Sequence, residues 1–289
     1  MTEILADELG KEGGPKGVRL VALSGPTHAE EVAIDLPTTI VSASKDMEAA
    51  AFVQEVFTNN VMRVYTNEDI KGVELSGAMK NVIALGVGIS TGLGYGDNAR
   101  AALITRGIAE IARLGVAMGC NVHTFAGLAG IGDLIVTATS MHSRNNRAGI
   151  LIGKGETPEN AVREVGMVVE GMNALPAALE LAERYRVEMP IVQTVNAIVN
   201  KGMSAAEAVK SLMERGLKNE LPQGLRKNKT KKGRVSCLST THTAALVRMF
   251  WPCCRTVCAR RGTAPGAYDI GRPLGRDRDV LLQWSQSQS

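Results

Sequence analysis

The sequence is poor in aromatic residues, which make up 3% of its 289 residues. A core must therefore be built from aliphatic side chains, and the 31 glycines favour close helix packing over a β-sandwich. The chain also lacks an apolar run of about 18 residues, so we expect no membrane span. Residues 1–14 lack the apolar stretch of a secretory signal. The two absences together predict a cytoplasmic protein.

Cysteine is scarce before residue 223, where only Cys120 occurs, and this excludes a disulfide framework. Residues 223–289 hold the other four cysteines, both tryptophans and thirteen Lys and Arg against three Asp and Glu. The preceding 222 residues carry 20 Lys and Arg against 26 Asp and Glu. So abrupt a change in charge marks a boundary. Because residues 223–289 show no sustained period, we expect a basic tail that is disordered or derives from a shifted reading frame.

Glycine loops that bind phosphate are also absent, since neither G-x-G-x-x-G nor a P-loop occurs. Gly92, Gly94 and Gly96 alternate, but no third glycine stands at the required spacing. His123, His142 and the cysteines of the tail lack the spacing of metal ligands, so we expect no metal. The tail also lacks interleaved aromatic residues and a recognisable binding fold, so we expect no nucleic-acid partner.

Residues 1–68 alternate between strand and helix patterns, which indicates an α/β layer. Three short apolar runs predict strands, and Thr27 and Asp46 stand where two helices would begin. A doubly wound sheet normally has about six strands, so we expect the C-terminal part of a Rossmann-like parallel sheet. The predicted strands are 18–24, 38–42 and 62–66, and the predicted helices are 27–32 and 46–57.

Residues 69–222 predict an all-helical domain, because strand patterns nearly vanish after Asn67. Ile104, Ile108, Ile111 and Leu114 recur at the helical spacing of three and four residues. Pro176 and Pro190 punctuate the later part of this region. The predicted helices are 69–92, 98–118, 157–165, 170–186 and 204–215.

Lys80 is the first candidate for chemistry, because it lies in an apolar helical run just after Ser76, Gly77 and Ala78. Small residues let a ligand approach the backbone closely. Burial disfavours the charged ammonium, and a neutral amine can act as a general base. The alternative is a lysine whose stem packs on the helix while its ammonium group stays in water.

A second cluster lies in residues 127–149, where Asp133 follows a glycine-rich turn. Ser143, Arg144, Asn145 and Arg147 follow Asp133 and together offer donors suited to a phosphate or carboxylate. If these residues open a helix, free backbone amides add to an anion site. The alternative is a solvated polar loop with a basic surface.

Two weaker candidates lie elsewhere in the sequence. Gly25 and Thr27 follow the first predicted strand, where a ligand could bind beyond the strand end. Glu170, in the sequence VVEG, could accept hydrogen bonds from a ribose or an amide. The alternatives are an ordinary turn with a helix cap at Thr27 and a solvated carboxylate at the start of a helix.

Four segments of the chain resemble NAD(P)-dependent glycerol-3-phosphate dehydrogenases of the bacterial type. They are LSGPTHAEEVA, RVYTNEDIKGVELSGAMKNVIALGVGISTGLGYGDNARAALITRG, GLAGIGDLIVTATSMHSRNNRAG and VVEG. Their order and gaps match the family from residue 23 to 220. The resemblance implies a helical domain like the C-terminal domain of 6-phosphogluconate dehydrogenase, after the end of a Rossmann layer.

The resemblance also implies an activity, the reduction of dihydroxyacetone phosphate to sn-glycerol 3-phosphate with NADH or NADPH for phospholipid synthesis. Lys80 would be the proton acceptor, and Arg144 would contact both substrate and cofactor. A homodimer is compatible with this resemblance. The implied substrate residues are Gly25, Thr27, Lys80, Asp133, Ser143, Arg144 and Asn145, and the implied cofactor residues are Ala29, Arg144, Val168 and Glu170.

The chain departs from the family at both ends. Members of the family begin with a strand and a glycine-rich dinucleotide fingerprint, whereas here only 24 residues precede Gly25. Without those backbone amides the binding of NAD(P) should weaken. The alternative to an active enzyme is therefore a catalytically impaired fragment that keeps the helical domain. The tail from Gln223 does not resemble the family either.

Overall fold

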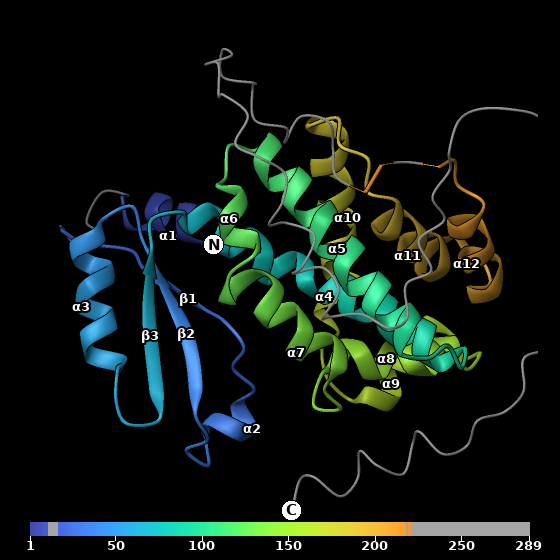
Figure 1. Ribbon diagram of the computed structural model, residues 1–289, viewed down its shortest axis with the longest axis horizontal. Coiled ribbons are helices and arrows are strands. Elements are labelled where there is room, and N and C mark those ends of the chain that lie inside the picture. The colour runs from blue at the N-terminus through green and yellow to red at the C-terminus, as the bar shows by residue number, and fades with distance from the viewer. Residues whose placement is uncertain (11–16, 218, 221–289) are drawn as a thin grey trace, which may run out of the picture. The chain divides into compact units, whose positions relative to one another are not determined.

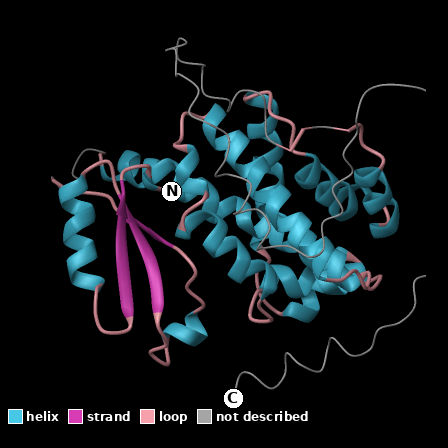
Figure 2. Cartoon of the chain, viewed as in Figure 1, coloured by secondary structure: helices cyan, strands magenta, loops and turns pink. Residues whose placement is uncertain are grey.

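The computed structural model describes residues 1–10, 17–217 and 219–220 (Figure 1). The predicted tail, residues 223–289, lies outside the described residues. The strands gather on one side and most helices on the other (Figure 2). The elements are α1 Thr2–Leu9, β1 Ala22–Ser24, α2 Ala29–Val32, β2 Thr38–Ala43, α3 Met47–Phe57, β3 Met62–Asn67, α4 Ile70–Gly92, α5 Asp97–Ala117, α6 Val122–Phe125, a π-helix Leu128–Gly132, α7 Asp133–Thr139, α8 Arg144–Gly153, α9 Pro158–Val165, α10 Glu170–Arg184, α11 Pro190–Lys201 and α12 Ala205–Met213.

The described residues form one sheet in the order β1-β2-β3, and each strand lies where the sequence predicts one, although β1 covers only the last three residues of the predicted range 18–24. β2 and β3 are parallel, and α3, which connects them, packs against both. β1 is antiparallel to β2, with Ala22 opposite Ala43, so the expectation of a wholly parallel sheet is wrong at this strand. The physical reason lies in the chain between β1 and β2. The one helix in this connection, α2, is a single turn and is too short to cross a sheet face.

The residues that cap α2 and α3 agree with the sequence pattern at only one of the two helices. The helix predicted from Asp46 is present as α3, and Asp46 caps it, because its carboxylate accepts hydrogen bonds from the backbone amides of Glu48 and Ala49. Thr27 does not cap α2. His28 occupies the N-cap position, and the Thr27 hydroxyl donates to the Gly25 carbonyl at 3.3 Å.

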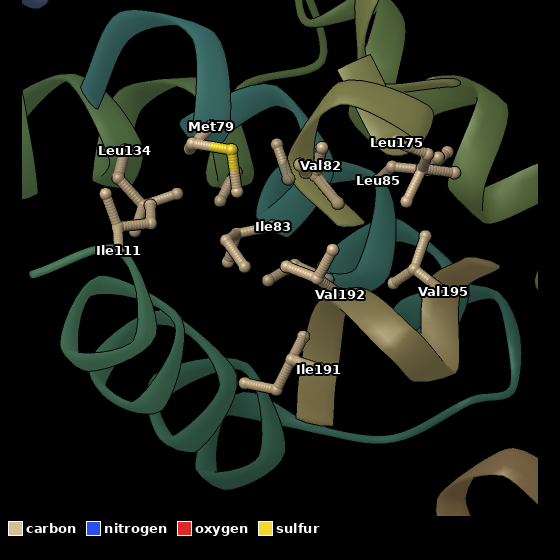
Figure 3. Packing of buried hydrophobic residues seen from close by; sticks show 14 of the residues in the cluster. Met79, Val82, Ile83, Leu85, Ile111, Leu134, Leu175, Ile191, Val192 and Val195 are labelled. Atoms are coloured by element: carbon tan, nitrogen blue, oxygen red, sulfur yellow. The ribbon is translucent and has the colours of Figure 1, made fainter. Parts of the chain in front are cut away.

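The helical region is built around α4, which contacts α5, α7, α8, α10 and α11. Val82, Ile83, Ala84 and Leu85 are consecutive and fully buried, so α4 is covered on every side. Figure 3 shows this core, in which α4 meets side chains from four other helices. They are Ile111 from α5, Leu134 from α7, Leu175 from α10, and Ile191, Val192 and Val195 from α11.

Glycines bring α4 and α8 into close contact. A Cβ atom on Gly88 would overlap the Asn146 carbonyl oxygen and lie 2.9 Å from the Gly149 Cα atom. Gly92 and Gly153 face each other one turn further along, with the same lack of room. Gly92, which fits no phosphate loop in the sequence, is therefore a packing residue.

A second, smaller core joins the sheet to the helices. Val41 and Ala43 from β2 pack with Ile70 and Val73 from α4, and with Ala129 from the π-helix. This contact brings the sheet beside the N-terminal half of α4, the helix that carries Lys80.

The predicted helices are found within a few residues of their expected ends, and the described residues after Asn67 contain no strand. Residues 144–147 do open a helix, α8. Pro190 begins α11, whereas Pro176 lies inside α10 without ending it. The sequence interpretation missed α1, α6, the π-helix, α7 and α11.

Candidate active site

Lys80 and Asp133 form the centre of the candidate site. The Lys80 Nζ atom donates to the Asp133 Oδ1 atom across the contact between α4 and α7. Asp133 is almost wholly buried, with 4% of its side chain exposed, whereas 20% of the Lys80 side chain is exposed. Lys80 is therefore neither a surface lysine nor isolated, because it reaches a buried carboxylate while solvent retains access to it.

Asp133 owes its place to the segment before it. The π-helix Leu128–Gly132 ends directly at Asp133, the first residue of α7. A π-helix is rare and often occurs at functional sites, because the extra residue per turn redirects the side chains that follow. The glycine-rich turn predicted before Asp133 is thus a helical insertion that rests on α4.

The electrostatics of Asp133 combine burial with three favourable neighbours. Burial raises the pKa of the Asp133 carboxyl, because a buried carboxylate loses its hydration. Lys80, the Thr137 hydroxyl and His28 act in the opposite direction on the same pKa. Thr137 lies one turn along α7, and its Oγ1 atom donates to Asp133 Oδ1 at 3.3 Å. These neighbours favour a carboxylate opposite the Lys80 ammonium group.

Ser143 caps the N-terminus of α8. Its hydroxyl accepts a hydrogen bond from the Asn146 amide at 3.2 Å, and its side chain is buried. The Asn146 side chain is also buried and donates to the Ala138 carbonyl at 2.7 Å. The residues predicted to bind phosphate thus open a helix, whose first amides can bind an anion.

Asn145 links three helices through both ends of its amide. Its Nδ2 atom donates to Asn81 Oδ1 at 3.0 Å, and its Oδ1 atom accepts from the Gly171 backbone amide at 2.8 Å. Asn81 directly follows Lys80 on α4. The Asn145 side chain therefore holds α8 and the start of α10 against the part of α4 that carries Lys80.

Arg144 and Glu170 form a second ion pair at the same ends of α8 and α10, with Arg144 Nη2 2.8 Å from Glu170 Oε1. The two side chains are 34% and 46% exposed, so a ligand can reach both. Glu170 is thus a paired carboxylate, not merely a solvated one. Val168, just before it, is 57% exposed.

The turn after β1 lies close to the Lys80–Asp133 pair. Gly25 is buried at φ +154°, and a Cβ atom there would lie 3.1 Å from the Ile40 Cα atom, so a glycine is required. Ser24 Oγ would lie 3.5 Å from a Cβ atom on Gly77, three residues before Lys80. Thr27 is half-buried, and the exposed Ala29 begins α2.

The structure adds residues that sequence reasoning missed. Thr137 stands one helical turn after Asp133, and Asn81 directly follows Lys80, so both could have been found by their spacing. His28 was missed because its contacts come from tertiary packing. Ser76, one turn before Lys80, has a buried hydroxyl without a hydrogen-bond partner in the described part of the chain.

The described residues contain no cluster of three or more His, Cys, Asp or Glu that could hold a metal ion. One stretch, Val122–Thr139, has the length and hydropathy of a membrane span. In the structure this stretch forms α6, the π-helix and α7, and Phe125 and Leu134 within it are buried in the helical core.

Fold and site together define a class of proteins in which an α/β sheet adjoins an all-helical unit that holds a lysine–carboxylate pair. Comparison with known families narrows this class. Residues 69–210 match the family described as NAD-dependent glycerol-3-phosphate dehydrogenase C-terminus, and residues 1–50 match the corresponding N-terminus. The chain belongs to the NAD-dependent glycerol-3-phosphate dehydrogenase family.

Individual relatives agree with this assignment. The chain is 65% identical over 221 residues to a glycerol-3-phosphate dehydrogenase [NAD(P)+] of Lactobacillus delbrueckii, covering 76% of this chain and 66% of the relative. It is 55% identical to one of Bacillus subtilis, covering 76% of this chain and 63% of the relative. The chain therefore spans somewhat less than two thirds of the length of these relatives.

A solved structure shares the fold. The glycerol-3-phosphate dehydrogenase of Coxiella burnetii superposes with a TM-score of 0.70 at 40% sequence identity, covering 74% of this chain and 64% of that one. The yeast enzyme gives a TM-score of 0.64 at 27% identity, covering 73% and 62%. The predicted fold class, the end of a Rossmann-like layer followed by a helical domain, is confirmed.

Proposed function

We propose that this chain carries the substrate-binding and proton-transfer machinery of an NAD(P)-dependent glycerol-3-phosphate dehydrogenase. Its reaction would interconvert dihydroxyacetone phosphate and sn-glycerol 3-phosphate. The observation that carries the proposal is the pairing of half-buried Lys80 with buried Asp133. The names of the relatives support the same activity.

Lys80 would move the proton of the reaction. In the reductive direction its ammonium group gives a proton to the substrate carbonyl oxygen, which becomes the secondary hydroxyl of the product. In the oxidative direction the neutral amine takes that proton back. Asp133 accepts the hydrogen bond of Lys80 and fixes the direction of Nζ, and Thr137 holds Asp133 in place.

The start of α8 would bind the substrate phosphate. The helix offers its first backbone amides, and the Arg144 guanidinium adds a fork of donors suited to phosphate oxygens. Asn145 and Ser143 already use their side chains in hydrogen bonds within the protein. We therefore assign them the positioning of this site in addition to the predicted contact with substrate.

The exposed groups beside this site fit one end of a nicotinamide cofactor, which would supply or accept the hydride when bound. Glu170 can accept hydrogen bonds from ribose hydroxyls, and Arg144, its partner, can contact a phosphate. Val168, two residues before Glu170, offers exposed apolar surface. Ala29, two residues after Thr27, is also exposed. We predict that these residues contact the cofactor.

The wider setting is proposed on the same basis. It comprises a role in glycerophospholipid synthesis, a cytoplasmic location and a homodimer. The division of the chain at residues 68/69 and 222/223 into three parts also remains a prediction. Sedimentation velocity of the purified chain tests the homodimer directly.

The test of the function separates binding from turnover. The purified 289-residue chain is mixed with NADH or NADPH and dihydroxyacetone phosphate, and cofactor oxidation is followed by absorbance. We expect oxidation that requires the ketone and falls at least about a hundredfold in Lys80→Met. Lys210→Met, at an exposed ion pair on α12, is the control and should retain the rate.

Calorimetric titration with sn-glycerol 3-phosphate, without cofactor, decides between the two candidate roles. Binding without turnover assigns the chain the impaired role, a part of the enzyme that binds substrate alone. Turnover undiminished in Lys80→Met would overturn the assignment of the proton to Lys80. If the chain neither binds sn-glycerol 3-phosphate nor oxidises the cofactor, the proposed function is overturned.

A further inference from the structure

His28 reaches from the sheet region to the helix that carries Asp133. Its Nε2 atom lies 3.4 Å from the Val136 carbonyl oxygen in the last turn of α7. A carbonyl can only accept, so a hydrogen bond here requires the proton on Nε2. The same carbonyl accepts the Ser140 amide at 3.1 Å, so His28 contacts the C-terminal end of α7.

His28 also lies against the segment that leads into α8. Its ring centroid is 5.9 Å from that of His142, with the two planes tilted by 55°. His142 directly precedes Ser143, the cap of α8, and its backbone amide donates to Ser140 Oγ at 3.1 Å. One side chain thus contacts both the end of α7 and the entry to the candidate phosphate site.

Charged and titratable groups on several elements lie around His28. The C-terminal end of a helix carries partial negative charge, which attracts an imidazolium. Asp133 on α7 and Glu30 and Glu31 in the first turn of α2 add negative charge. Lys80 on α4 carries positive charge, and His142 is a second titratable ring beside His28. Burial raises the pKa of Asp133, and interaction with His28 lowers it.

We propose that His28 is a positioning residue for the Lys80–Asp133 pair. It docks residues 25–29 on α7 through the Val136 carbonyl and adds positive charge beside the Asp133 carboxylate. It thereby keeps that carboxylate ready to hold the Lys80 ammonium group. The inference rests on the proposed function, because the pair matters only if Lys80 transfers a proton.

Two substitutions in the full chain separate the hydrogen bond from the charge. His28→Gln keeps a side-chain N–H donor for the Val136 carbonyl but cannot become positive. His28→Phe keeps the ring and loses both properties. His123→Phe is the matched control, because His123 is exposed on α6 and its side chain takes no part in the candidate site.

The first readout is amide hydrogen exchange at residues 25–29 and 136–140. We expect faster exchange there in His28→Phe, with recovery in His28→Gln, because the donor is restored. The second readout is the pH midpoint at which the Asp133 carboxyl group titrates, followed by the NMR signal of its carboxyl carbon. This midpoint should shift to higher pH in both His28 variants and stay unchanged in His123→Phe.

The third readout is the affinity for sn-glycerol 3-phosphate without cofactor. We expect a loss of about tenfold in His28→Phe, which corresponds to about 1.4 kcal/mol, and a change within about twofold in His28→Gln. If the unmodified chain binds no glycerol 3-phosphate, the proposed function fails. Amide hydrogen exchange and the Asp133 titration then still test the role of His28, because neither needs the ligand.

The inference is overturned if His28→Phe leaves the local exchange and the Asp133 midpoint as they are in the unmodified chain. It is equally overturned if His123→Phe reproduces both changes. If His28→Phe does not fold, His28→Gln decides alone. An unchanged Asp133 midpoint in that variant contradicts the electrostatic role.

Discussion

Lys80 and Asp133 lie 53 residues apart in the chain and meet as an ion pair between α4 and α7, with the carboxylate almost wholly buried. A buried charge is tolerated because it has a partner, so the pair links stability to the chemistry that we propose.

Breaking the pair from either side should destabilise the fold. Removing one partner of a buried pair typically lowers the free energy of unfolding by about 3 kcal/mol, because the other charge is left uncompensated. We expect this for Lys80→Met and for Asp133→Asn, and a smaller loss in the double variant than the sum of the two. Urea unfolding measures all three, and strictly additive losses would show that the two residues do not interact.

Asn145 should stabilise the site through its two hydrogen bonds. Asn145→Ala leaves Asn81 Oδ1 and the Gly171 amide without these partners, which we expect to lower the free energy of unfolding by about 1–3 kcal/mol. Asn160→Ala, on the exposed face of α9, should change it much less. Urea unfolding compares the two, and equal losses would argue against the bridging role.

The contact between α4 and α8 should not tolerate a methyl group. Gly88→Ala places a Cβ atom where the Asn146 carbonyl lies, so the helices must separate, at a loss of about 1–3 kcal/mol or more. Gly96→Ala is the control, because a Cβ atom there meets nothing within 4 Å. Thermal unfolding of the two variants makes the comparison, and an unchanged melting temperature in Gly88→Ala would contradict the close packing.

Glu110 predicts a pH dependence of stability. Its side chain is buried and accepts hydrogen bonds from the Ile191 amide at 2.9 and 3.1 Å, at the start of α11. Burial raises the pKa of this carboxyl from 4.5 to about 7, although the amides of Ile191 and Val192 and the charges of Arg113 and Arg106 lower it. The proton is therefore held more tightly in the folded chain than in the unfolded chain.

The sign of the effect follows from this difference. The contribution of Glu110 to the free energy of unfolding should be fully present below about pH 4.5. It should be lost, by up to about 3 kcal/mol, as the pH rises through about 7. Glu110→Gln should flatten this slope, whereas Glu159→Gln, exposed on α9, should keep it. Urea unfolding between about pH 5 and about pH 8 gives the answer, and a slope unchanged by Glu110→Gln would exclude Glu110 as its source.

Much of the fold could be predicted because the signals are local. The long apolar run of α4 and the cap at Asp46 each fix an element within a few residues. The stretch Val122–Thr139 could not be divided correctly, because it is apolar and glycine-rich and its helices are short. At Pro176 a local signal is misleading. Proline disfavours a helix interior, but the packing of Leu175 and Ala178 keeps α10 helical through this residue.

The sequence indicates the residues of the candidate site but not their geometry. Lys80 and Asp133 were candidates separately, and their pairing depends on how α4 packs on α7. Asn145 was predicted to bind phosphate, whereas its amide also bridges three helices. Contacts of this kind arise from tertiary packing and leave no periodic trace in a sequence.

The most direct test of the central claim is an NMR titration of the chain with sn-glycerol 3-phosphate, in which backbone amide shifts locate the ligand. The account predicts shifts at Lys80, Asp133 and residues 143–145. Shifts confined instead to the apolar cavity lined by Val195 and Leu212, or no shifts at all, would contradict it.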